Sequence, residues 1–138
     1  MIFRQLFDST SSTYTYLLAS RRGGEALIID PVLDRVDRYL KLIEELDLRL
    51  VKAVDTHLHA DHITGALHLK QRTGCRIAAP AMERLPCADV GIVEGVPLPV
   101  GSLALHPLHT PGHTDSHFAY LIGERVFTGD ALLIDDGH

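Results

Sequence analysis

Four side chains able to bind a metal ion lie within six consecutive positions: His57, His59, Asp61 and His62. Imidazole nitrogens and carboxylate oxygens are ligands for zinc, iron and manganese. The apolar run at residues 50–54 predicts a buried strand that leads directly into this segment. If the chain stays extended, alternate residues share a face, which brings His57, His59 and Asp61 together, and a turn at Asp61 then adds His62 at the start of a helix. The spacing therefore predicts a metal site rather than a surface loop that happens to be rich in histidine.

A second histidine group is centred on His113. Pro111 and Gly112 form a turn signal that would present His113 at the tip of a loop. The flanking His109 and His117 are more typical of packed residues, or of residues that orient a ligand, than of ligands themselves. We interpret His113 as a ligand because the first motif requires partners from elsewhere in the chain.

A third motif places Asp130 after a strand-like run and Gly129, and before the apolar residues 131–134. That setting is unusual for a solvated charge, although Gly-Asp also occurs in ordinary turns. With His57 and His113, Asp130 completes a set of two histidines and one carboxylate. Such a set leaves coordination positions open and is typical of non-haem Fe(II) oxygen chemistry.

The elements that must position these side chains alternate between strands and helices. Apolar runs and helical spacing predict strands at residues 2–7, 13–18, 26–29, 50–54, 76–79, 103–108, 118–122 and 125–128, and helices at residues 36–46 and 62–73. The last two strands would form a hairpin through residues 123–124. Residues 81–99, rich in proline and glycine, are expected to be irregular. This order predicts an α/β (α+β) fold.

Bulk properties limit the class of protein. A chain of 138 residues with 46% apolar and 22% charged residues predicts a single domain, residues 1–138, with a substantial core. The net charge of -5 argues against a broad nucleic-acid surface. We find no apolar stretch of the roughly 20 residues that span a membrane. Only two cysteines and no visible targeting segment lead us to expect a cytoplasmic protein.

In this order and at these separations, the three motifs resemble the metallo-β-lactamase superfamily. The motifs are Thr-His-Leu-His-Ala-Asp-His at residues 56–62, His-Thr-Pro-Gly-His at residues 109–113 and Phe-Thr-Gly-Asp-Ala-Leu-Leu at residues 127–133. Within the superfamily, His-Ile-Thr-Gly at residues 62–65 and Gly-Asp-Ala-Leu-Leu-Ile at residues 129–134 resemble the persulfide dioxygenase branch.

The resemblance implies an αββα sandwich with a metal at one edge, between the two sheets. It implies one Fe(II) held by His57, His113 and Asp130, which would oxidise glutathione persulfide with O2 to sulfite and glutathione. Further residues would hydrogen-bond to these ligands, or hold a second metal ion as in the zinc hydrolase relatives: His59, Asp61, His62 and Asp115.

The chain departs from the family in length, because such proteins continue well past the Gly-Asp-Ala-Leu-Leu-Ile segment. We therefore expect the C-terminal half of the sandwich to be incomplete. Apolar faces left open would favour a homo-oligomer. Two alternatives stay open: a Zn(II)-dependent thioester hydrolase of the glyoxalase II kind, and a catalytically silent metal-binding fragment.

Overall fold

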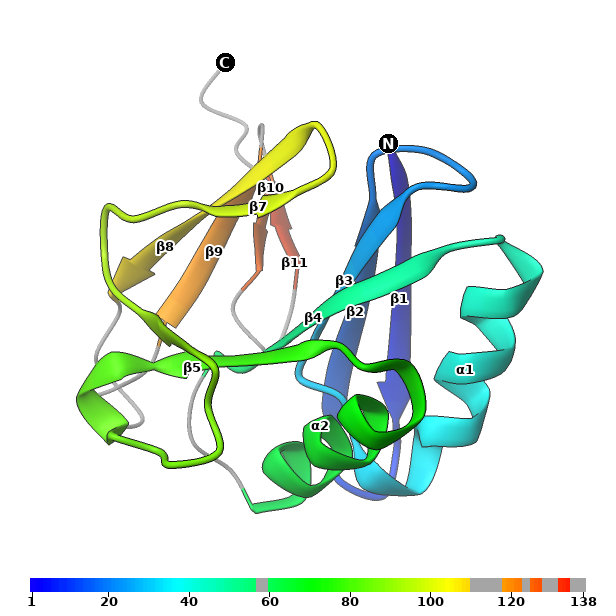
Figure 1. The fold of residues 1–138 in the computed structure, drawn as a ribbon, viewed down its shortest axis with the longest axis horizontal. Helices are drawn as coiled ribbons and strands as arrows, with labels where there is room; N and C mark the ends of the chain where they lie inside the picture. Colours follow the sequence, from blue (N-terminus) through cyan, green and yellow to red (C-terminus); the bar gives the residue numbers. More distant parts are fainter. Residues whose placement is uncertain (57–59, 110–117, 123–124, 128–131, 135–138) are drawn as a thin grey trace.

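Two β-sheets face each other in this chain, and helices cover the outer face of the first (Figure 1). The structure is a computed structural model that describes residues 1–56, 60–109, 118–122, 125–127 and 132–134. The predicted α/β layering is confirmed. Over these ranges, no helix is long and apolar enough to cross a membrane.

The first sheet combines an antiparallel N-terminal part with a parallel remainder. Its strands, in spatial order, are β1 (Ile2–Asp8), β2 (Thr13–Ala19), β3 (Glu25–Ile29), β4 (Arg49–Val54), β5 (Arg76–Pro80) and β6 (Val90–Ile92). Strands β3 to β6 run parallel. The parallel connections from β3 to β4 and from β4 to β5 contain α1 (Val36–Glu45) and α2 (Ala60–Thr73), and short 3-10 turns lie at Leu33–Arg35 and Ala81–Glu83.

Both faces of the first sheet are buried, which explains the unbroken apolar run in β3. Leu27 and Ile29 face the second sheet, whereas Ala26 and Ile28 face the helices. Because side chains alternate along a strand, a strand covered on both sides needs apolar residues at every position. The core is therefore two layers of side chains, one between the sheets and one beneath α1 and α2.

The second sheet is antiparallel throughout. Its order is β11 (Leu132–Ile134), β10 (Arg125–Phe127), β9 (Phe118–Ile122), β8 (Leu103–His109) and β7 (Leu98–Val100). Leu98, Val100, Leu105, Tyr120 and Ile122 fill the layer between the sheets.

The longer predicted elements are confirmed, but the expectation that residues 81–99 are irregular is partly wrong. That range contains β6 and the start of β7, and β11 was also missed; each has only three residues. Alternation over three residues is too short a signal to recognise. Pro99 is tolerated because β7 is an edge strand, where a missing N–H donor costs no ladder hydrogen bond.

The start of α2 corrects the geometry expected for the first motif. The helix begins at Ala60, so Asp61 is helical rather than extended. The argument from alternate positions therefore does not apply to Asp61. An aspartate in the first turn is favoured because the N-terminal end of a helix carries partial positive charge.

Helix α2 lies so close to the loop after β3 that one position on it requires glycine. A Cβ atom on Gly65 would come within 2.8 Å of the Pro31 carbonyl oxygen and 3.0 Å of the Leu33 nitrogen. Both neighbours are backbone atoms, which cannot move aside as a flexible side chain can. Gly65 thus lets α2 pack against the segment that follows Asp30.

We predict that Gly65→Ala destabilises the protein by about 1–3 kcal/mol, because overpacking outweighs the gain of roughly 1 kcal/mol in helix propensity. Denaturant unfolding measures the change. Gln71→Ala, at an exposed position of the same helix, is the matched control and should shift stability by less than about 0.5 kcal/mol. Equal stability of the two variants would contradict the proposed close approach.

Candidate metal site

The segments that contain the three expected ligands all follow carboxyl ends of strands. His57 comes three residues after β4, His113 lies between β8 and β9, and Asp130 lies between β10 and β11. Strands β8 and β10 both pair antiparallel with β9, so they run in the same direction and end at the same edge. Figure 1 shows the ends of β8 and β10 on the side of the second sheet that lies nearest α2.

Tyr120 connects that edge of the second sheet to the end of β4. Its side chain is fully buried, and its hydroxyl donates to the backbone carbonyl oxygen of Asp55 at 2.5 Å. In the sheet Tyr120 pairs with Pro107 and Phe127, near the ends of β8 and β10. This hydrogen bond thus joins the end of β4 to the strand that lies between β8 and β10. Burial, followed by the charges of Asp30 and Asp55, raises the pKa of Tyr120 well above its ordinary value, so the hydroxyl stays a donor.

Asp30 fixes the residue that precedes His57. Its carboxylate is fully buried and accepts two hydrogen bonds from Thr56, one from the backbone N–H to Oδ1 at 2.8 Å and one from Oγ1 to Oδ2 at 2.6 Å. The backbone of Asp30 has φ of 55°, a left-handed conformation that aspartate tolerates better than most residues. This conformation follows directly on the end of β3, whose neighbour β4 ends just before Thr56.

A chain of hydroxyl groups supports Asp30 from behind. Thr15 Oγ1 donates to the Asp30 carbonyl oxygen at 2.7 Å, so the Tyr39 hydroxyl, 3.1 Å away, must donate to Thr15. The Tyr39 oxygen in turn accepts from the Val32 N–H at 3.1 Å. Strand β2, helix α1 and the loop after β3 are thereby connected to the same edge.

Asp55 is a buried carboxyl group with no partner in the described part of the chain. Its side-chain oxygens are inaccessible and lack a hydrogen bond there. Burial, and then the neighbouring Asp30 carboxylate, raise the pKa of Asp55 well above its usual range. Buried polar groups normally have a partner. The partner of this carboxyl group, two positions before His57, therefore lies outside the described residues.

The expected ligands themselves fall outside the described part of the structure. The structure does not describe His57, His113 and Asp130, nor does it describe His59 and Asp115. For Asp61 and His62, the backbone is placed in the first turn of α2. Among the side chains that are described, no three histidine, cysteine, aspartate or glutamate residues come together. The ligand assignment stays a prediction.

Sequence reasoning overlooked three buried positions at this edge: Asp30, Asp55 and Tyr120. Asp30 carried a signal, because an acidic residue directly after a fully apolar strand is unusual. The role of Tyr120 depends on a contact across 65 residues, which no local pattern reveals.

Comparisons with known proteins agree with this architecture. Residues 9–137 match the family described as the metallo-beta-lactamase superfamily. The chain is 43% identical to "Persulfide dioxygenase ETHE1, mitochondrial" of Mus musculus, over 97% of this chain and 54% of that protein. The crystal structure of ETHE1 from Myxococcus xanthus superposes with a TM-score of 0.88 at 51% identity, covering 97% of this chain and 59% of that one.

A hydrolase is also similar to the chain. The hydroxyacylglutathione hydrolase of Rhodospirillum rubrum is 36% identical over 88% of this chain and 48% of its own length. The chain thus spans about half the length of the curated relatives that it matches.

We predict that Tyr120→Phe lowers the free energy of unfolding by about 1–2 kcal/mol, because the buried Asp55 carbonyl oxygen loses its donor. Tyr14→Phe is the matched control, since the Tyr14 hydroxyl has no hydrogen bond within the described residues. Denaturant unfolding of both variants measures the difference. If the two substitutions lowered the free energy of unfolding equally, the hydrogen bond from Tyr120 to Asp55 would not stabilise the fold.

Proposed function

We propose that this chain, which belongs to the metallo-β-lactamase superfamily, has the site of an iron-dependent persulfide dioxygenase in a single domain of residues 1–138. The observation that supports it best is the identity of 43–51% to persulfide dioxygenase relatives over 97% of the chain. The hydrolase relative reaches 36% over 88%.

His57, His113 and Asp130 would hold the iron. Two imidazoles and a carboxylate are a donor set suited to Fe(II), and all three residues follow strand ends at one edge. The buried Asp55 carboxyl fits such a centre, because it has no partner among the described residues and lies two positions before His57. The residues present are therefore compatible with the metal.

The proposed reaction converts one glutathione persulfide, one O2 and one water into one glutathione, one sulfite and two protons. Bound iron would supply the redox step, which zinc cannot, and a common binding position for both substrates. The contribution of the chain is positional. Asp30 binds Thr56 and Tyr120 binds the Asp55 carbonyl oxygen. These two contacts fix the backbone that leads from β4 to His57.

The remaining polar residues of the motifs would orient the ligands. A histidine ligand keeps one tautomer when its second ring nitrogen is hydrogen-bonded. We assign this function, or the binding of a second metal ion, to four residues: His59, Asp61, His62 and Asp115.

The second candidate is a Zn(II)-dependent thioester hydrolase, which the similarity to hydroxyacylglutathione hydrolase favours. Metal-bound hydroxide would be its nucleophile. A catalytically silent metal-binding fragment is the third candidate, because the chain spans about half of its relatives.

The partners we propose are glutathione persulfide and O2, with neither nucleic acid nor membrane. A cytoplasmic location also stays a proposal, since similar mammalian proteins are named mitochondrial.

We further propose that copies associate through the outer face of the second sheet. There β8 exposes Ala104, His106 and Leu108, and no helix of the described residues covers it (Figure 1).

We predict that the purified chain contains about one iron per chain and consumes O2 when glutathione persulfide is added. Elemental analysis and an oxygen electrode measure the two quantities. Two zinc ions per chain with hydrolysis of a glutathione thioester would favour the hydrolase instead.

Variants separate the ligands from their neighbours. His57→Ala should abolish oxygen uptake, and oxygen uptake by this variant would refute the proposed centre.

Asp130→Ala should lose the metal more severely than Asp115→Ala, which is the matched control because it removes an identical carboxylate from an adjacent motif. Comparable metal content in the two variants would contradict the ligand assignment.

We predict that light scattering at micromolar concentration gives a mass at least twice the 15.2 kDa of one chain. Replacing Leu108, whose exposed fraction is 37%, with lysine should shift the population toward monomers because a charge would enter the apolar contact. A wild-type monomer would contradict self-association.

A further inference from the structure

A basic region lies at the edge of the first sheet opposite to the candidate metal site. Two cavities of about 520 and 450 Å³ lie side by side where β3, β4 and β5 begin, and they share Glu25 and Arg49. Both cavities are widely open to solvent rather than enclosed. The first cavity also contacts Arg21 and the turn at Gly101, and the second continues along β4 and β5.

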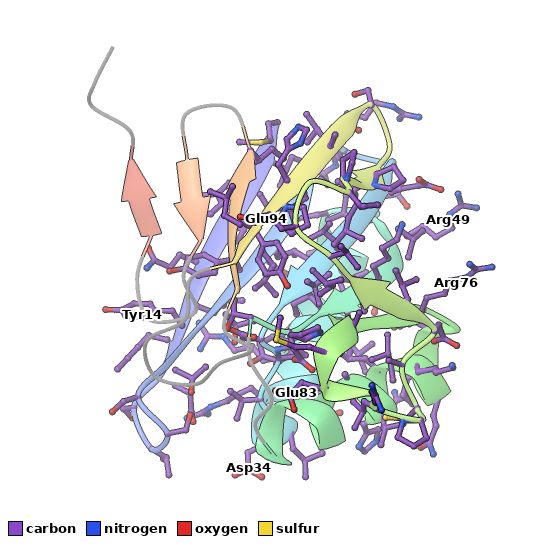
Figure 2. The ribbon with its side chains drawn as sticks, turned by 90° about the vertical axis from the view of Figure 1, so that its left-hand side faces the viewer. Tyr14, Asp34, Arg49, Arg76, Glu83 and Glu94 are labelled. Atoms are coloured by element: carbon purple, nitrogen blue, oxygen red, sulfur yellow. The ribbon has the colours of Figure 1, made fainter. Side chains whose placement is uncertain are left out.

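The residues that line these cavities carry more positive than negative charge. Arg21, Arg49, Lys52 and Arg76 line them, against the single carboxylate of Glu25. The whole chain has a net charge of -5, so this region differs in sign from the molecule as a whole. Figure 2 shows Arg49 and Arg76 projecting from the same side of the molecule. In the sheet, Lys52 pairs with Arg76, which places these cationic residues on adjacent strands.

The cations differ in how far they are already paired. Arg49 Nη2 contacts Glu25 Oε2 at 2.6 Å, while the Gly101 N–H donates to Glu25 Oε1 at 3.1 Å. Lys52 Nζ donates one hydrogen bond to the Pro99 carbonyl oxygen at 2.9 Å. Arg76 forms no hydrogen bond or ion pair with another described residue, although its charge helps to lower the pKa of the Asp89 carboxyl.

The positive charges also disfavour one another. Partial burial lowers the pKa of Lys52, the charge of Glu25 raises it, and the charge of the nearby Arg76 lowers it by a smaller amount. An anion placed between Lys52 and Arg76 would relieve this repulsion. Arginine contributes two parallel donors to such an anion, and lysine a compact charge.

We propose that this edge is a binding site for a small polyanion that carries several phosphate groups, such as the polyphosphate portion of a nucleotide. The ligand must carry several negative charges because Arg49 and the Gly101 N–H already bind the Glu25 carboxylate. A ligand with a single carboxylate would have to compete with Glu25 for these donors. An oligophosphate can instead contact Arg49, Lys52 and Arg76 together. The site is independent of the metal centre at the other edge.

Calorimetric titration of the full chain with inorganic triphosphate tests the proposal. We expect saturable binding that weakens as salt increases, because the contacts are electrostatic. Arg76→Ala should weaken binding about tenfold or more, as the loss of a charged hydrogen bond implies. The control is Arg38→Ala, an equally exposed arginine on α1 outside both cavities, which should retain wild-type affinity.

Two further measurements decide the chemistry of the ligand. Glu25→Gln should strengthen triphosphate binding, because it removes the only carboxylate from the cavity walls. Citrate, a carboxylate polyanion, should bind more weakly than triphosphate. The proposal fails if Arg76→Ala and Arg38→Ala bind triphosphate equally, or if citrate binds as well as triphosphate. Circular dichroism of each variant ensures that a loss of binding is not a loss of fold.

Discussion

The backbone that leads into the candidate metal site depends on the carboxylate of Asp30. This carboxylate is fully buried and accepts two hydrogen bonds from Thr56, so a change at either residue removes two hydrogen bonds from the core. Hydrogen bonds to a buried charge contribute on the order of 1.5–3 kcal/mol each. Behind Asp30, Thr15 and Tyr39 connect β2 and α1 to the same point. Through these contacts, the packing of the first sheet holds Thr56, the residue that precedes His57, in one position.

The two edges of the parallel strands have opposite electrostatic character. At the carboxyl ends lie the buried Asp30 and Asp55, the second with a raised pKa, whereas Arg49, Lys52 and Arg76 lie at the amino ends beside Glu25. A cation is suited to the first edge and an anion to the second. Because the sheet separates the two edges, a ligand at one need not compete for space with a ligand at the other. This division gives the domain room for two binding functions without enlarging the fold.

Much of the fold could be predicted from the sequence, because strands and helices of five residues or more show their periodicity. Among the three-residue strands, β10 was predicted as one arm of a hairpin with β9, whereas β6, β7 and β11 were not, since pairing with neighbours rather than composition defines them. For the site, residue types and spacing indicated a metal and a family. The roles of Asp30 and Tyr120 arise from contacts between distant segments, and the helical start at Ala60 was hidden because histidine-rich motifs have no clear period.

The layer between the sheets has a consequence for how the protein is made. Its first half, including Tyr16, Leu18, Leu27 and Ile29, leaves the ribosome long before its second half, which begins at Leu98. Until residues 98–122 are synthesised, the nascent first sheet presents a wide apolar face to solvent. Such a face is prone to aggregation during translation. The growing chain should therefore be a good substrate for chaperones that hold exposed sheets, until the arrival of the second sheet buries that face.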